Sequence, residues 1–346
     1  MSLADVITPQ WVKDRFLAGI DLTDDTGTAF PEALFQEGID SAISILESDL
    51  DLVLSGTYEY VERRDTNDFH TESFFHMKLD HRPVVEVSDL NVQFGDYPSA
   101  SIPRSWMHIS SAKAGQVQVL PGPEGIGSII FGGTAPFLGL AGLYGRPYTP
   151  LWFKIKYKAG FEVDLSGTVG VTTGATTITG TNTYFLNPLN DPDYVTNFGD
   201  NYGGGFMPRV MPGNYVVLSG TVDGEEIFET RYVKRVKSDT SIVVNSPFTF
   251  TGTGLTVRLH MYPPAILNAV GLLAAMLPLD TAGDLIVGAG IASKSMSVDG
   301  LSTSINTTAS STNAGYGARM LSYKNRLKDL IKSIKRDYRA PNVMVA

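Results

Sequence analysis

The sequence contains no cysteine among its 346 residues. A disulfide framework, thiolate chemistry, a cysteine-ligated zinc and an iron–sulfur cluster are therefore excluded. The longest apolar run, Ala265–Leu279, is interrupted by Asn268 and Pro278 and is shorter than the roughly 20 residues that a membrane-spanning helix needs. The first ten residues lack the basic and apolar segments of a secretory signal. We expect a soluble protein of a reducing compartment, without membrane contact.

The sequence also lacks an excess of basic residues. It has 36 acidic and 27 basic side chains, which give a net charge of −9. This balance argues against general wrapping of nucleic acid. The charge is unevenly distributed: residues 313–346 carry net +6, and the first 312 residues carry net −15. Such asymmetry predicts that the basic C-terminal segment meets a different surface from the acidic body. Its basic residues are Arg319, Lys324, Arg326, Lys328, Lys332, Lys335, Arg336 and Arg339.

Helical patterns occupy the two ends of the chain. Thr8 followed by Pro9 is typical of a helix start, and a second helix is expected from about Pro31 into the fifties. Near the C-terminus we expect a buried helix over residues 266–277 and a long amphipathic helix near 313–339. On the last helix, cations on the solvent face are ordinary and suit the helix dipole, so a contact role and a purely structural role both remain open. The Ser/Thr-rich residues 293–315 are expected to be extended or loop.

Strand patterns fill the middle of the chain. Residues 58–161 alternate polar and apolar positions over strand lengths, separated by Pro and Gly clusters. Residues 166–260 differ in character, with 16 Thr and 13 Gly among short β-branched runs. Many short strands at near-regular spacing predict a small barrel or sandwich.

The sequence offers only weak motifs for chemistry. GAGIASKS (288–295) approximates a phosphate-binding loop, but Ser293 replaces the required glycine. Asp25-Thr26-Gly27 resembles an aspartic-protease motif in letters only, and residues 21–32 imitate a calcium loop without its central glycine. The five histidines show no helical zinc spacing, and His70, His76 and His81 are expected to be cross-strand or turn residues. We expect no enzyme activity, no catalytic residues, no cofactor and no metal site.

Two stretches resemble known phage proteins. The C-terminal run 283–345, with its GIASKS and SVDGLS blocks and its Tyr-containing amphipathic helix, resembles the end of head-to-tail connector (adaptor) proteins of tailed bacteriophages. The opening ITPQWVKDRFLAGIDL is similar to the start of such connectors. The Thr/Gly segment 166–260 is similar to a β-module of phage tail and fibre proteins, and it interrupts the connector-like sequence as an insertion.

The resemblance implies an α+β fold: a helical connector core with β-hairpins or a small sheet, plus an inserted all-β barrel or sandwich. The connector core would be discontinuous, formed by residues 1–165 and 261–346, with 313–346 as C-terminal helix and docking arm and 166–260 as the inserted domain. The eight basic residues of the arm become the candidate portal-docking residues.

The function that the resemblance implies is structural and not enzymatic. Such connectors form homo-oligomeric rings, usually dodecameric, in the neck of the virion, and they assemble in the host bacterial cytoplasm. The expected partners are the portal protein, a tail-terminator, stopper or other neck protein, further copies of the chain, and duplex DNA passing through the channel without sequence-specific binding. An acidic channel wall would repel duplex phosphates. The alternative is a tail- or baseplate-associated receptor- or glycan-binding module that uses the 166–260 domain.

Overall fold

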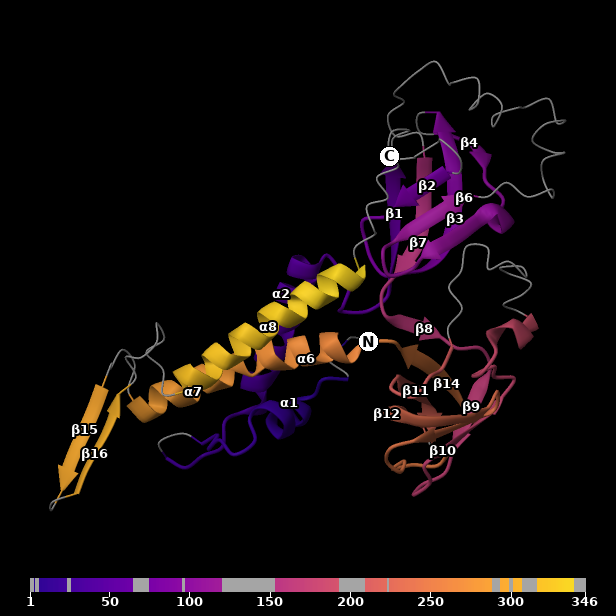
Figure 1. The fold of residues 1–346 in the computed structure, drawn as a ribbon. Helices are drawn as coiled ribbons and strands as arrows, with labels where there is room; N and C mark the ends of the chain where they lie inside the picture. The colour runs from indigo at the N-terminus through magenta and orange to yellow at the C-terminus, as the bar shows by residue number, and fades with distance from the viewer. Residues whose placement is uncertain are drawn as a thin grey trace, which may run out of the picture. The chain divides into compact units, whose positions relative to one another are not determined.

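The computed structural model describes residues 3, 6–23, 26–64, 75–94, 97–119, 153–192, 209–222, 224–287, 293–298, 301–306 and 316–338. These residues form an α+β fold that contains a closed six-stranded barrel. They divide into two compact units (Figure 1). We call the described parts of 1–50 and 263–337 the helical unit, and those of 51–262 together with Tyr338 the β unit.

The helical unit is built from both ends of the chain. Its helices are α1 (Pro9–Phe16), α2 (Glu32–Leu50), α6 (Pro264–Ala274), α7 (Met276–Val287) and α8 (Gly317–Tyr338). Strands β15 (Ser293–Val298) and β16 (Leu301–Asn306) form a separate antiparallel hairpin. The extended structure expected for the start of the Ser/Thr-rich stretch is therefore confirmed.

Local sequence explains the first two helices. The Thr8 side chain accepts a hydrogen bond from the Trp11 backbone N at 3.2 Å, which caps α1 as its Thr-Pro start predicts. On α2 the apolar residues Phe35, Ile39, Ala42, Ile43, Leu46 and Leu50 recur every three or four positions and are buried. The helix ends at Leu50, earlier than the expected run into the fifties, because Asp51 adopts a left-handed φ of 60°.

Helices α6 and α7 follow one another almost end to end (Figure 1). A Cβ on Gly38 of α2 would lie 2.7 Å from the carbonyl oxygen of Ala274, so glycine permits α2 to approach α6 closely. The stretch Pro264–Gly283 has the length and hydropathy of a membrane-spanning helix, in contrast to the expectation from the sequence. Buried core helices share these properties, and Ile266, Val270 and Leu272 are each fully buried here.

Two small sheets form the first part of the β unit. One has the order β1-β7-β3-β4, and the other has the order β2-β6-β5. Both contribute to a single apolar core that includes Val87, Val117 and Ile155. The strands are β1 (Tyr58–Arg64), β2 (Phe75–Lys78), β3 (Val84–Phe94), β4 (Tyr97–Ser101), β5 (Met107–Ser111), β6 (Gln116–Val119) and β7 (Phe153–Ala159).

The barrel forms the second part of the β unit. Its strands follow the order β11-β12-β13-β10-β9-β14, and pairing of β11 with β14 closes the ring. The predicted all-β module is therefore a barrel rather than a sandwich. Strand β8 (Glu162–Asp164) pairs with the last residues of β14, on the same edge of β14 that pairs with β9. The barrel strands are β9 (Thr168–Val171), β10 (Thr177–Thr181), β11 (Tyr215–Val222), β12 (Glu225–Ser238), β13 (Ser241–Val244) and β14 (Gly252–His260).

The barrel has its own apolar core. Its buried members lie between Val169 and Leu259 and include Ile178, Val216 and Val233. The compact units divide the described chain at 50/51 and 262/263, whereas the predicted domains divide it at 165/166 and 260/261. The predicted domain division stays a prediction.

Candidate functional site

The candidate docking residues lie on helix α8. Lys324, Lys328 and Lys332 are exposed and four positions apart, so they follow one another along one side of the helix at intervals of about 6 Å. We call these three residues the lysine stripe. Within the described part of the chain, no hydrogen bond or ion pair occupies their side chains. The stripe therefore exposes three positive charges along one side of α8.

Two of the predicted docking residues instead hold α8 within the helical unit. Arg319 donates a hydrogen bond to the carbonyl oxygen of Phe16 at 2.7 Å, and the Tyr323 hydroxyl donates to the same oxygen at 2.5 Å. Lys335 forms an ion pair with Asp49 of α2 at 2.8 Å. The sequence pattern did not distinguish basic residues that make internal contacts from basic residues that are exposed.

The other predicted docking residues have different surroundings. Arg326 is exposed but lies two positions from Lys324 and Lys328, on another side of the helix. Arg336 is exposed beside Asp337, with 3.7 Å between the charged atoms. Arg339 lies outside the described residues.

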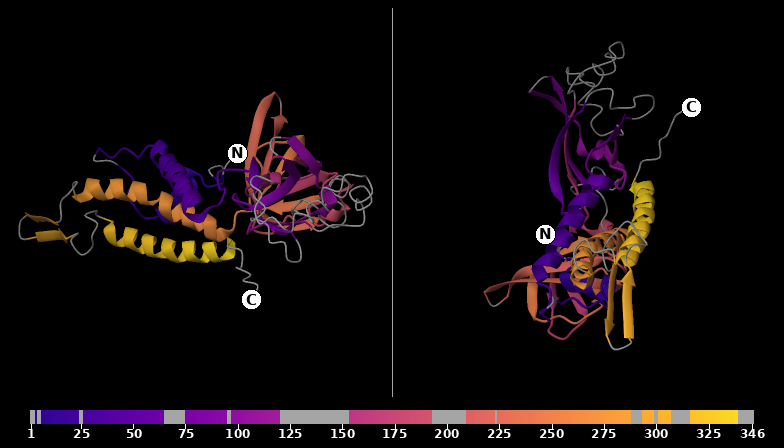
Figure 2. Two further views of the ribbon diagram at one scale, coloured as in Figure 1. Left: turned by 90° about the horizontal axis from the view of Figure 1, so that it is seen from above. Right: turned by 90° about the vertical axis from the view of Figure 1, so that its left-hand side faces the viewer.

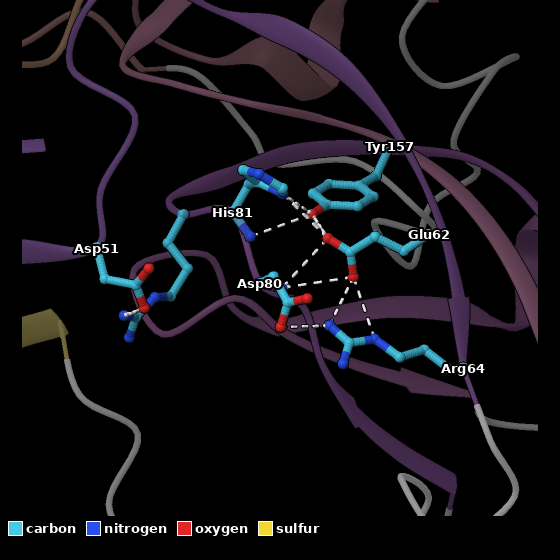
Figure 3. Close-up of polar contacts among 7 residues, drawn as sticks. Asp51, Glu62, Arg64, Asp80, His81 and Tyr157 are labelled. Carbon is cyan, nitrogen blue, oxygen red and sulfur yellow. Dashed lines mark hydrogen bonds and ion pairs between the residues drawn. The ribbon is translucent and has the colours of Figure 1, made fainter. Parts of the chain in front are cut away.

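A second polar assembly, which the sequence analysis missed, lies on the β1–β7 pair (Figure 3). We call it the Glu62 cluster: Glu62, Arg64, Asp80, His81 and Tyr157. The Glu62 side chain is only 10% exposed, and Arg64 donates to its Oε2 from Nη2 at 2.7 Å and from Nε at 3.1 Å. The Tyr157 hydroxyl donates to Oε1, and Arg64 also pairs with Asp80 at 2.5 Å.

His81 completes the Glu62 cluster from the turn before β3. Its Nδ1 lies 3.1 Å from Glu62 Oε1 and 3.0 Å from the Tyr157 hydroxyl, and its ring stacks on Tyr60 with 3.7 Å between centroids. Burial, followed by the hydrogen bond to Glu62, raises the pKa of Tyr157, so the phenol stays protonated and remains a donor. The carboxylate is thus surrounded by donors that fix the 79–83 turn to the sheet.

Arg82, the next residue of this turn, is buried and reaches other segments. Its guanidinium donates to Asp51 Oδ2 at 2.6 Å and to the Tyr338 carbonyl oxygen at 2.8 Å. Its own carbonyl oxygen accepts a hydrogen bond from the Val53 backbone N at 2.7 Å. Asp51 stands apart from the Glu62 cluster in Figure 3. The turn therefore contacts the sheet through His81 and contacts both chain ends of the β unit through Arg82.

One histidine is completely buried on the outer side of the barrel wall. His260 of β14 is opposite Glu162 of β8, and its Nε2 lies 3.8 Å from Glu162 Oε1. Neither ring nitrogen of His260 has a hydrogen-bond partner in the described part of the chain. Burial lowers the pKa of His260 to about 4, so the imidazole is neutral at neutral pH.

The weak motifs do not assemble into a reactive centre among the described residues. Ser293–Val298, where a phosphate loop would open a helix, is strand β15, in agreement with the sequence analysis, which set the phosphate-loop motif aside. The described residues contain no group of three metal-ligating side chains. His76 lies in β2 opposite Gln118 and His81 lies in a turn, which confirms their expected placement, while His70 and Asp25 lie outside the described residues.

Neither a scan against protein-family models nor a search of curated proteins finds a match for this chain. The connector resemblance therefore stays a prediction that rests on the sequence motifs quoted above.

Proposed function

We propose that this chain is a head-to-tail adaptor of a tailed bacteriophage. In this proposal it forms a homo-oligomeric ring, with twelve copies as the resemblance implies, between the portal and a stopper, tail terminator or other neck protein. DNA passes through the ring without sequence-specific binding. The observation that carries the proposal is the lysine stripe of α8: three exposed cations, without a partner among the described residues, on a helix that other side chains anchor.

The arrangement of α8 supports a docking role. Met320, Tyr323 and Ile334 are buried, and Arg319 and Lys335 bind Phe16 and Asp49, so the helix is fixed near its start and near its end. A fixed helix presents its free charges without the entropy cost of ordering a flexible arm. The connector-like sequences at the two ends of the chain supply the two parts of the same helical unit, which supports a discontinuous helical core.

The charge distribution supports passage of DNA. The first 312 residues carry net −15, so a channel lined by them would repel duplex phosphates rather than bind them. Helix α8 is rich in basic residues and poor in acidic ones, which would direct attraction toward the portal. Localisation in the virion neck, after assembly in the bacterial cytoplasm, belongs to the same proposal.

Reversing the lysine stripe is expected to abolish binding to the cognate portal without unfolding the chain. The variant is Lys324→Glu, Lys328→Glu and Lys332→Glu in the full-length chain, and co-sedimentation with purified portal rings measures binding. Each ion pair that a stripe lysine would form with the portal contributes only about 0.2–1 kcal/mol alone, but a ring repeats the loss in every subunit.

The matched control uses other exposed positions of the same helix, Ser322→Ala and Asn325→Ala, and should bind like the wild type. Melting temperatures should agree among all three proteins, because exposed substitutions change stability by roughly 0.5 kcal/mol or less. Unchanged portal binding by the reversed stripe would contradict the docking role. The receptor- or glycan-binding alternative stays a prediction, which a glycan array with the full chain tests.

A further inference from the structure

Strand β12 continues beyond the part of the barrel wall that it shares with β13. Its pairing with β13 begins only at Val233, whereas residues 225–231 have β11 as their only neighbouring strand among the described residues. Figure 2 shows this β11–β12 hairpin, in salmon, projecting from the barrel. Gly224 takes a left-handed φ of 85° at the tip, as an Asp-Gly hairpin turn requires. Over residues 225–231 the edge of β12 away from β11 has no neighbouring strand among the described residues, although Arg231 Nη2 donates to the Pro247 carbonyl oxygen at 3.0 Å and Glu229 accepts from the Thr249 backbone N at 3.3 Å.

The charges of β12 are separated along its length. Glu225 and Glu226, at the hairpin tip, form what we call the acidic end; Lys234, Arg235 and Lys237 form the basic end. All five side chains are exposed. None of the five makes a hydrogen bond or an ion pair with any other described residue. Both ends thus present uncompensated charge to solvent.

Backbone irregularities produce the basic end. The register of β12 against β13 shifts between Val233 and Arg235 and again between Val236 and Ser238. A bulge interrupts the strict alternation of a strand, which is how the adjacent residues Lys234 and Arg235 are both exposed. The nearby acid Asp239 does not neutralise them, because its carboxylate accepts backbone hydrogen bonds from Leu186 and Asn187, each at 2.9 Å.

The two ends cannot neutralise each other within one chain. Glu226 and Arg235 are nine residues apart on an extended strand, which is about 30 Å. The Debye length at physiological ionic strength is about 8 Å, so attraction over that distance is screened. A protein surface of complementary charge for either end can come from another molecule.

We propose that the acidic end of one copy docks on the basic end of the next copy. The surfaces differ, so the contact is heterologous and propagates from head to tail, and it forms a ring when the rotation between neighbouring copies closes. Two exposed aromatic side chains supply apolar area beside the charges: Phe228 on the hairpin is 41% exposed, and Tyr232 before the basic end is 40% exposed. The inference deepens the proposed ring by naming an interface between neighbouring copies.

Charge reversal tests this pairing on the full-length chain alone, with sedimentation velocity as the measurement. One variant reverses the basic end (Lys234→Glu, Arg235→Glu, Lys237→Glu), and a second reverses the acidic end (Glu225→Lys, Glu226→Lys). Each variant alone should need about ten-fold more protein for half-assembly than the wild type, since several weak pairs are lost per contact. A 1:1 mixture should recover wild-type assembly, because each acidic surface then meets a basic one.

A chain with both ends of β12 reversed should also assemble, since it still carries one acidic end and one basic end, with their positions exchanged. Thr168→Glu and Thr172→Glu, at exposed positions on and just after β9, which pairs with β10 and β14 and not with β12, control for added negative charge and should assemble normally. The interface is contradicted if the wild type stays monomeric, if single-end variants assemble at the wild-type concentration, or if folded variants are not rescued by mixing. The sedimentation experiment contains no portal, so it tests the interface between copies by itself. If the chain assembled but did not bind the portal, the adaptor proposal would be overturned and this interface would stand.

Discussion

Replacing Glu62 by alanine is expected to lower the free energy of unfolding by about 3 kcal/mol. The Glu62 carboxylate accepts hydrogen bonds from Arg64 and Tyr157 in a site where its side chain is only 10% exposed. Without it, the largely buried Arg64 guanidinium keeps Asp80 as its remaining acidic partner, and the Tyr157 hydroxyl loses its acceptor. Urea unfolding monitored by circular dichroism measures the change.

The same strand supplies a matched control for this prediction. Glu59 of β1 forms an ion pair with Lys156 at 2.9 Å, but its side chain is 45% exposed. Glu59→Ala should therefore cost less than about 1 kcal/mol. Equal losses for Glu59→Ala and Glu62→Ala would show that the Glu62 cluster is no more stabilising than a surface ion pair.

Acidification is expected to destabilise the protein through His260. Burial lowers the pKa of this residue to about 4 in the folded state, against 6.5 for the free side chain. Between these values the unfolded chain binds more protons than the folded one, so the free energy of unfolding falls as the pH falls. The contribution is fully present above pH 6.5, and about 3 kcal/mol of it is lost by pH 4.

The variant His260→Gln isolates this contribution from the titration of the carboxylates. Urea unfolding at a series of pH values from 7.5 to 4 should give a shallower pH dependence for the variant than for the wild type, by close to one proton between pH 6.5 and 4. Parallel pH profiles for the two proteins would show that His260 is not buried as a neutral imidazole.

The helices and their cores could be predicted from the sequence because their determinants are local. Thr8-Pro9 marks the start of α1, and the spacing of Ile39, Ile43 and Leu46 sets the buried side of α2. For residues 166–260 the sequence predicted an all-β fold but did not distinguish a barrel from a sandwich. Its closure depends on pairing between β11 and β14, which strand patterns do not encode.

The Glu62 cluster could not be predicted, because its members come from distant segments. Glu62 and Tyr157 are 95 residues apart and become neighbours only through the pairing of β1 with β7. The same reason explains the mixed outcome on α8. Arg319 and Lys324 look alike in the sequence, and only the Phe16 carbonyl oxygen, 303 residues from Arg319, makes the first an internal contact.

Electron microscopy of the purified full-length chain tests the adaptor proposal most directly. Negative-stain class averages should show closed rings with a central channel wide enough for duplex DNA and a single subunit number. The wild type should form such rings at a lower protein concentration than the variants with one end of β12 reversed. Monomers at every concentration, both alone and with the cognate portal, would contradict the central claim that this chain builds the neck ring.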